Sequence, residues 1–289
     1  MKQLCVFGSL HLDVIVNADH LPQTDETVVG SKVNYICGGK GGNQALAADG
    51  LGANVYFIGR IGADAFGETL SKKLSNSSVD VSQLQRDKGS SGMSVAIIDR
   101  QGDYGAVIVS ESNLRINKTK FLISKDTGIL LLQNEVLDEI NLSASQKAKQ
   151  EGAQVWLNAA PARKISTELL KNLDLMVVNR PEAEFYKDYL ESDESSHLIK
   201  ISTLGAEGLN VQFSNEEPQH HNAYSINVRS AHGAGDMFVG ALAAQYLKTN
   251  NFLDSLNYAQ AAAAIKASRN VTEGTRIKEY DVLTFLKNV

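Results

Sequence analysis

Short apolar runs alternate along the chain with segments of helical periodicity. The apolar runs that we expect to form buried strands are residues 4–8, 55–58, 129–132, 155–157 and 175–178. The helical patterns cover residues 44–50, 65–74, 143–151, 167–172, 183–189, 234–249 and 252–268. This alternation predicts an α/β fold in which helices cover both faces of a mostly parallel sheet and right-handed crossovers join the strands. Ligands of such sheets bind beyond the carboxyl ends of the strands.

Two stretches interrupt this alternation with a period of two. Residues 12–16 with 28–36, and residues 92–99 with 105–109, have the pattern of antiparallel hairpins. Turn-forming residues 100–103 separate the second pair. We therefore expect a small sheet separate from the main one. Because an exposed sheet edge invites pairing, this sheet is a candidate dimer contact, although closure over a ligand would cover it equally well.

Size and charge exclude several classes of protein. The 289 residues suffice for a large core, and we expect one domain rather than two. A net charge of -5 gives no basic surplus, so DNA or RNA binding is not expected. The two cysteines, Cys5 and Cys37, form neither a disulfide framework nor a zinc cluster. No apolar run reaches the ~18 residues that span a bilayer and no charged leader precedes the first strand, so we expect a cytoplasmic protein.

The sequence Gly233-Ala234-Gly235-Asp236 leads directly into an apolar helical stretch. The free amides of a helix's first turn and its dipole attract anions, and small residues let an anion approach them. An ionised Asp236 at this point could accept the proton of an attacking alcohol. The motif therefore suits phosphoryl transfer. The structural alternative is that Gly235 ends a loop and Asp236 caps the helix.

A second glycine-rich segment, residues 37–44, surrounds Lys40 and precedes an alanine-rich run. It matches neither the Walker phosphate loop nor the dinucleotide-binding pattern. We expect its glycines to let ligand oxygens reach the main chain. Asn43, about one turn into the expected helix, could offer a donor and an acceptor to a small polyol. The structural alternatives are an N-cap for Asn43 and a solvated loop cation for Lys40.

With these motifs the chain resembles ribokinase-type sugar kinases of the PfkB carbohydrate kinase family. The resemblance covers nearly the whole chain and includes residues 7–13, the glycine-rich segment, and residues 57–67, 157–163, 179–184, 203–205 and 233–236. It implies a ribokinase-like three-layer fold, a single kinase domain over residues 1–289, and a β-sheet lid over the sugar. The lid would comprise segments of about 12–36 and 92–110, which are often used in the family for homodimer contact.

The resemblance also implies an activity. A kinase of this type transfers the terminal phosphoryl group of ATP, with Mg²⁺, to the primary hydroxyl of a small sugar, here expected to be a pentose such as ribose. Asp236 would take the proton of that hydroxyl. The amides of Gly233, Ala234 and Gly235 would hold the transferring oxygens. Phosphoryl transfer depends mainly on positioning and charge stabilisation, so a weakly basic carboxylate suffices.

On the sugar side, the resemblance assigns substrate binding to residues of three segments: His11, Asp13, Gly39, Lys40, Asn43 and Glu135. A carboxylate such as that of Asp13 can accept hydrogen bonds from neighbouring hydroxyls. The structural alternatives are a turn-forming Asp13 and a Glu135 that serves the dipole of a helix start. His11 stands where the family usually has Asn, so ribose itself is less firmly implied than a small sugar.

On the nucleotide side, the resemblance assigns Asn179 and Glu182 to an element that organises Mg²⁺, in the case of Glu182 through water. Magnesium keeps much of its hydration, so few protein ligands are needed. Asn179 and Glu182 also fit a capping box at a helix start with Pro181 in the first turn, and both roles are compatible. Thr203 and Gly205 match nucleotide-loop positions, and Gln260 would face the adenine.

Several positions depart from the family pattern. Ser230 replaces an acid that helps to hold a monovalent cation, and residues 270–273 lack the usual glycine-led turn, which argues against potassium activation. His232 adds a titratable ring beside the anion site, where it either approaches phosphate or lies exposed. Residues 185–202 are about one helix shorter than usual, with 191–196 expected as a loop. His220 and His221 have no metal-ligand spacing and are expected at the surface.

Other functions stay open from the sequence. Fold and phosphate chemistry do not select the acceptor, so a nucleoside kinase or a hexose-phosphate kinase is the alternative within the same class. A sugar- or nucleotide-binding sensor of low activity is the alternative outside it. The departures at His11 and Ser230 and the shortened segment 185–202 favour the sensor, and the intact residues 233–236 favour an enzyme.

Overall fold

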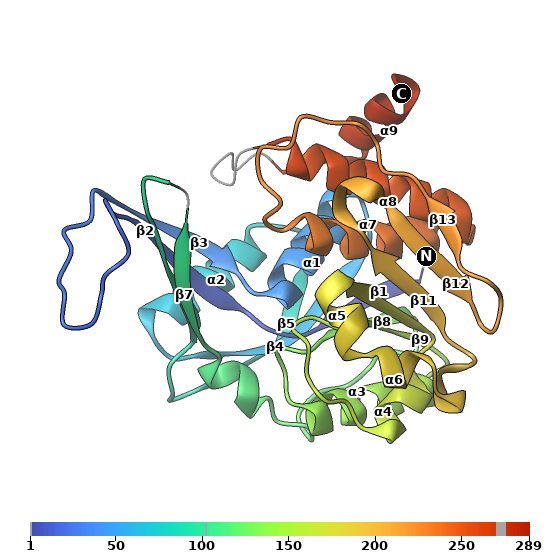
Figure 1. Ribbon diagram of the computed structural model, residues 1–289. Coiled ribbons are helices and arrows are strands. Elements are labelled where there is room, and N and C mark those ends of the chain that lie inside the picture. The colour runs from blue at the N-terminus through green and yellow to red at the C-terminus, as the bar shows by residue number, and fades with distance from the viewer. Residues whose placement is uncertain (1, 102, 270–275) are drawn as a thin grey trace.

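The computed structural model describes residues 2–101, 103–269 and 276–289, and within them the larger sheet has nine strands (Figure 1). Their spatial order is β13 (Gln219–His221), β12 (Leu209–Phe213), β11 (Ile199–Thr203), β10 (Leu175–Asn179), β9 (Gln154–Asn158), β8 (Thr127–Gln133), β1 (Gln3–Phe7), β4 (Val55–Gly62) and β5 (Asp80–Asp87). The strands from β11 to β5 are parallel, and β12 and β13 continue the sheet in antiparallel pairing. The predicted α/β class is confirmed.

Helices cover both faces of this sheet. One layer contains α1 (Lys40–Gly50), α2 (Ala65–Ser75), α7 (Ala234–Thr249), α8 (Phe252–Ala267) and α9 (Glu279–Lys287). The other layer contains α3 (Asp138–Gln150), α4 (Thr167–Asn172), α5 (Arg180–Phe185) and α6 (Lys187–Leu190). Each layer encloses its own apolar core against the sheet, because both faces of the parallel strands are apolar. Short 3₁₀ turns lie at η1 (Glu111–Arg115), η2 (Asp193–Ser195) and η3 (Gly205–Glu207).

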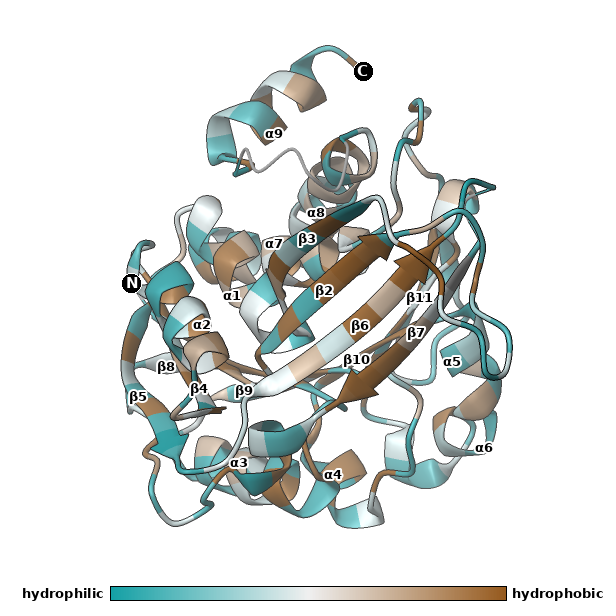
Figure 2. Ribbon diagram, turned by 90° about the vertical axis from the view of Figure 1, so that its left-hand side faces the viewer, coloured by the Kyte–Doolittle hydropathy of each residue, from teal (hydrophilic) through white to brown (hydrophobic). Residues whose placement is uncertain are grey.

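A second, four-stranded sheet projects from the body (Figures 1 and 2). Its order is β3 (Lys32–Gly38), β2 (His11–Asn17), β6 (Gly92–Ile98) and β7 (Tyr104–Val109). The pairing register places Asp13 beside Ser94 on one face. On the opposite face, Tyr35, Val14, Val95 and Val107 form one row across the four strands, because side chains alternate between faces. We call this second sheet the lid sheet.

The structure extends the predicted elements and adds others. Helix α1 begins at Lys40 instead of residue 44, α3 begins at Asp138 instead of 143, and the expected helix 183–189 is divided into α5 and α6. Residues 191–196, expected as a loop, contain the turn η2. The elements that the periodicity did not predict are β5, β11, β12, β13 and α9. No described helix is both long and apolar enough to cross a membrane.

Candidate active site

Asp236 is the third residue of α7, and its carboxylate meets the first turn of α1. Its Oδ2 accepts a hydrogen bond from Asn43 Nδ2 at 3.0 Å, and its Oδ1 accepts one from Gln44 Nε2 at 3.0 Å. In the sequence, Asn43 and Gln44 are 193 and 192 residues away from Asp236. Only 8% of Asp236 is exposed. The fold therefore brings together the two motifs that the sequence analysis singled out.

The surroundings of Asp236 act on its pKa in both directions. Burial raises the pKa above its ordinary value, and this effect prevails. The positive charge of Lys40 and the two amide donors lower it, and the negative charge of Glu135 raises it further. Asp236 is thus a stronger base than a solvated aspartate.

The first turn of α7 differs in detail from the expected anion site. Its N-cap is Gly233, whose φ of 72° lies in the left-handed region, so the alternative that Asp236 caps the helix is wrong. The Ala234 N–H already donates to the Ala231 carbonyl at 3.2 Å. Helix geometry leaves the N–H groups of Gly235 and Asp236 without an intrahelical acceptor. These two amides, rather than all three of Gly233 to Gly235, form the open end of the helix.

The glycines around Lys40 serve close backbone packing. A β-carbon on Gly39, whose φ is +86°, would lie 2.8 Å from main-chain atoms of Ser9, Leu10 and His11. The Lys40 N–H donates to Glu135 Oε2 at 2.8 Å, and the Gly42 N–H donates to the Ser9 carbonyl at 3.0 Å. The expectation that ligand oxygens reach these amides is therefore wrong for Lys40 and Gly42. Gly39 is the N-cap of α1, so Asn43 is not.

His11, Asp13 and Glu135 lie together where β2 joins the body. Asp13 Oδ1 accepts from Ser94 Oγ at 2.5 Å. His11 is 3% exposed, its Nδ1 lies 3.9 Å from Glu135 Oε2, and its Nε2 has no hydrogen-bond partner in the described part of the chain. Glu135 also accepts from the Ser9 hydroxyl. Glu135 stabilises the start of α1 and not that of α3, the helix that follows it in the sequence.

Burial raises the pKa of Asp13 above its ordinary value. The Ser94 hydroxyl and the charges of His11 and His232 lower it in part, while Glu135 raises it. His232 is exposed, yet it is close enough to Asp13 for its charge to act there. This group of side chains offers several polar atoms to a hydroxylated ligand.

A cavity of about 930 Å³ lies beside the first turn of α7. It is within the usual range for small-molecule and cofactor sites. Sequence-predicted residues that line it are Asn179, Thr203, Gly205, Ala234, Gly235 and Gln260. Its apolar lining includes Tyr224, Ile226, Val228, Phe238 and Ala263, which the sequence analysis did not identify. Residues 224–228 alternate between apolar and polar side chains, a strand-like pattern that could have indicated them, although they form no strand in the structure.

Asn179 and Glu182 form the capping box that the sequence analysis offered as an alternative. Asn179 Oδ1 accepts from the Glu182 N–H at 2.9 Å, and Glu182 Oε2 accepts from the Asn179 N–H at 2.8 Å. Burial raises the pKa of Glu182, the charge of Lys40 lowers it, and that of Asp236 raises it. The Glu182 carboxylate therefore lies near the charged centre as well as capping α5.

These contacts leave Glu182 suitable for a hydrated Mg²⁺. No hydrogen bond of its Oε1 is found within the described residues, and this buried carboxylate is close enough to Lys40 and Asp236 for their charges to act on its pKa. Mg²⁺ is commonly held by one or two carboxylates together with waters and phosphates. The donor set therefore fits that ion, whereas the Asn179 side-chain oxygen is already occupied by the cap.

The structure also shows the surroundings of other positions that the sequence analysis singled out as departures from the family pattern or as candidate metal ligands. Ser230 Oγ accepts from the His232 N–H at 3.2 Å, and the Ser230 N–H donates to the Ala267 carbonyl at 3.1 Å. Residues 270–273 lie outside the described residues. His220 pairs with Asn210 at 2.8 Å on β13. The sequence analysis missed Lys266 of α8, whose Cε lies 3.4 Å from the place of a β-carbon on Gly233.

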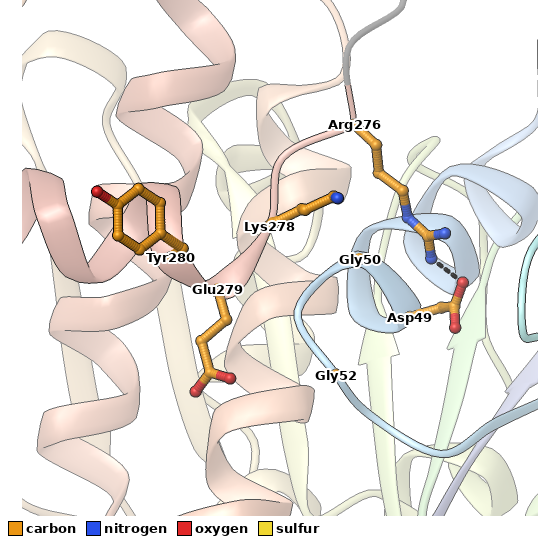
Figure 3. Close-up of a pocket in the computed structure, with 7 residues that line it drawn as sticks. All are labelled: Asp49, Gly50, Gly52, Arg276, Lys278, Glu279 and Tyr280. Carbon is orange, nitrogen blue, oxygen red and sulfur yellow. Dashed lines mark ion pairs between the residues drawn. The ribbon is translucent and has the colours of Figure 1, made fainter.

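A smaller pocket of about 330 Å³ lies elsewhere (Figure 3). It is formed by the last residues of α1 and the start of α9, and Arg276 pairs with Asp49 beside it. Asp49 is six residues along α1 from Asn43, and hence roughly 9 Å away along the helix axis. None of the predicted site residues lines this pocket. The candidate active site is therefore the region of Asp236 and the larger cavity.

A three-layer α/β fold with a lid sheet, and a carboxylate at a helix start beside a nucleotide-sized cavity, defines a phosphotransferase that acts on an alcohol. The sequence pattern of the pfkB family carbohydrate kinases matches residues 1–276. The chain belongs to this family. It is accordingly a phosphotransferase acting on a sugar hydroxyl, as the sequence analysis predicted.

Named relatives agree with this assignment. The chain is 28% identical to a ribokinase of Haemophilus influenzae, with 99% of each chain covered. The structure matches a ribokinase of Thermotoga maritima with a TM-score of 0.89 and 26% identity, covering all of both chains. It also matches Arabidopsis thaliana ribokinase complexed with ribose and ATP, with a TM-score of 0.88, 26% identity and 99% of each chain covered. The predicted ribokinase-like fold is confirmed.

Proposed function

We propose that this protein is an ATP-dependent pentose kinase that phosphorylates the primary hydroxyl of ribose or a close analogue. The observation that carries the proposal is the contact of Asp236 with Asn43 and Gln44. The contact supports the proposal because it joins a buried carboxylate at the start of α7, next to Gly235 of the cavity lining, to the start of α1, where Lys40 binds Glu135 of the polar group around Asp13. The ribokinases among the relatives support ribose as the first acceptor to test.

Asp236 is the general base of the proposed reaction. Asp13 accepts hydrogen bonds from sugar hydroxyls and orients the primary hydroxyl toward Asp236. As the hydroxyl oxygen forms its bond to the terminal phosphorus, the bond from that phosphorus to the bridging oxygen of ATP breaks. The hydroxyl proton passes to Asp236, and the products are the sugar phosphate and ADP. The raised pKa of Asp236 strengthens it as a proton acceptor.

The cavity holds the nucleotide. Its apolar side, with Tyr224 and Ala263, receives the base, and its far end at Gly235 receives the phosphates. The amides of Gly235 and Asp236 and the charge of Lys40 stabilise the transferring oxygens. Glu182 would hold hydrated Mg²⁺ near the phosphates. When bound, that ion supplies positive charge for the phosphate oxygens.

The lid sheet supports a homodimer. Its face away from Asp13 carries Tyr35 (63% exposed) and Val107 (65% exposed), and Figure 2 shows much of β2 and β7 as hydrophobic. An apolar face of this kind is unusual on a monomer. A second copy of the chain would cover it with the same surface, and the two lids would then hold one another over the sugar sites.

A matched pair of variants tests the proposed base. Asp236 and Asp254 are each the third residue of their helices, α7 and α8. With ATP, Mg²⁺ and ribose, Asp236→Asn should lower kcat by about 10³-fold or more, whereas Asp254→Asn should leave it unchanged. ADP release is measured with ribose, other pentoses, nucleosides and hexose phosphates. Retained turnover in Asp236→Asn would refute the base. Turnover only with a nucleoside, or only with a sugar phosphate, would show that the acceptor belongs to that class and is not a pentose. Saturable binding without turnover would indicate a sensor.

A further inference from the structure

Asp236 stands at the end of a line of buried side-chain amides. Gln44 Nε2 donates to Asp236 Oδ1 at 3.0 Å, and Gln44 Oε1 accepts from Gln133 Nε2 at 2.7 Å. Gln44 and Gln133 are both 0% exposed. The line therefore joins the end of β8, the N-terminal part of α1 and the first turn of α7, and its two glutamines are shielded from water.

The chemistry of Asp236 fixes the direction of this line. An ionised carboxylate only accepts hydrogen bonds, so Gln44 must turn its NH₂ group toward Asp236. Its carbonyl oxygen then faces Gln133, which must present its own NH₂ group. Each amide is thus held in one orientation by the next, and the sequence of donors ends on the carboxylate. Protonation of Asp236 would weaken the first of these bonds, because a charged acceptor strengthens it.

The opening segment of the chain makes room for Gln133. A β-carbon on Gly8 would lie 1.7 Å from Gln133 Oε1, and that oxygen has no hydrogen-bond partner within the described residues. A buried oxygen without a donor is costly, so this arrangement needs a compensating benefit. Keeping the Gln133 NH₂ group directed at Gln44 is such a benefit.

We propose that Gln44 and Gln133 are positioning residues for the phosphoryl-transfer reaction, which hold the Asp236 carboxylate ionised and aimed at the acceptor hydroxyl. The proposal rests on the function proposed above. Gln44 supplies one of two amide donors to the carboxylate, Asn43 being the other. Gln133 acts through Gln44, and Gly8 acts by leaving space for Gln133.

The charged groups around Asp236 act on its ionisation in opposite directions. Lys40 from α1 and Lys266 from α8 favour the ionised carboxylate, whereas Glu135 after β8 and Glu182 from α5 oppose it. The charges on the two sides are balanced in number, and burial disfavours the ionised form. Lys40 lowers the pKa of Asp236 most, and the amide donors of Asn43 and Gln44 lower it further, so together they limit how far burial raises it.

The test compares Gln44→Met, Gln133→Met and Ser255→Ala with the wild type. Methionine keeps approximately the volume of glutamine but donates no hydrogen bond. In Gln44→Met, kcat should fall about 10- to 100-fold, and the acid limb of the kcat/KM profile should move up by about one pH unit or more. The KM for ATP should be unchanged. Gln133→Met should shift the limb in the same direction by less, because Gln44 keeps its donor.

Ser255→Ala is the control for the loss of a buried polar group. Ser255 is 0% exposed and lies on α8, where its hydroxyl donates to the Asn251 carbonyl at 2.5 Å. It should leave the pH profile in place even if it lowers the melting temperature. An unshifted acid limb with kcat within about twofold of wild type in Gln44→Met overturns the proposal. If Gln44→Met does not fold, Gln133→Met decides by the same criterion. Activity in Asp236→Asn would instead refute the base on which this proposal rests, and wild-type protein that releases no ADP with any pentose would refute the proposed function.

Discussion

The substitution Asp13→Asn should raise the KM for the sugar and increase the free energy of unfolding at neutral pH. Asp13 accepts from Ser94 through Oδ1, and its second oxygen points toward Gly38, where a β-carbon would lie 2.0 Å from it. An asparagine can keep its carbonyl on Ser94. It loses the charge and one acceptor, both of which we assign to the sugar hydroxyls.

The sign of the stability effect follows from the pKa. Burial raises the pKa of Asp13 in the folded protein above the unfolded value. Between these two values the folded state binds a proton that the unfolded state does not, so the free energy of unfolding falls as pH rises through the window. Above the folded pKa the full cost of burying the charge is present. Below the unfolded pKa of about 4 the carboxyl group is neutral in both states, and the cost vanishes.

The magnitudes are measurable. Each pH unit between the folded and unfolded pKa corresponds to about 1.4 kcal/mol, which partial exposure of Asp13 to solvent reduces. A change of 1 kcal/mol moves the Tm of a chain of this size by about 2–4 °C. We therefore expect Asp13→Asn to melt a few degrees higher at pH 7.5. Loss of one or two charge-assisted hydrogen bonds to the sugar should raise the KM for ribose about 10- to 100-fold or more.

Thermal melts of both proteins between pH 3.5 and 8 provide the assay, with acceptor kinetics at pH 7.5. Asp64→Asn is the matched control, because the pKa of Asp64 is lowered despite burial by donors that include Ser91 and the Gly67 N–H. It should lose stability at neutral pH. A lower Tm for Asp13→Asn at pH 7.5, or a Tm gain that persists unchanged at pH 3.5, would refute the reasoning.

Two further predictions concern the backbone and the lid. Gly39→Ala should cost about 2–4 kcal/mol of unfolding free energy, because it combines a φ of +86° with atoms 2.8 Å away, whereas Gly205→Ala, with a φ of +64° and no atom within 4 Å, should cost only about 1 kcal/mol. Equal losses in urea titrations would contradict this. Val107→Asp, on the apolar lid face, should weaken the dimer about 10-fold or more in sedimentation, and Ile108→Asp, on the opposite face of the same strand, should weaken it less. A monomeric wild type would disprove the lid dimer.

Sequence patterns predicted the interior of the fold better than its margins. The interior strand β8 contains the apolar run 129–132 and is fully buried, so its pattern has one interpretation. The edge strand β5 is mostly polar, with Val81 and Leu84 as its apolar residues, and its sequence resembles a loop. The same holds for β13 at the other edge, which has three residues. Edge strands are decided by their neighbours in the sheet and carry little local signal.

The candidate site was also predictable only in part. The residue types at 233–236 indicated phosphoryl transfer because small residues at a helix start let an anion approach the free amides beside a carboxylate. The partners of residues 233–236 and 37–44 were not predictable. Glu135 stabilises the start of α1 from 95 residues away, and Gln133 reaches Gln44 from 89 residues away. Such contacts depend on how the strand ends converge.

The sequence by itself determined the α/β class and the family, because periodicity and motif composition are local properties of the chain. Only the tertiary structure decided that Asp236 is held by Asn43 and Gln44, and that the glycines beside Lys40 pack on residues 8–11. It also decided that one face of the lid sheet is apolar while the other carries Asp13. The physical reason is that hydrogen bonds and close packing between distant segments exist only after the sheet has set the positions of their backbones.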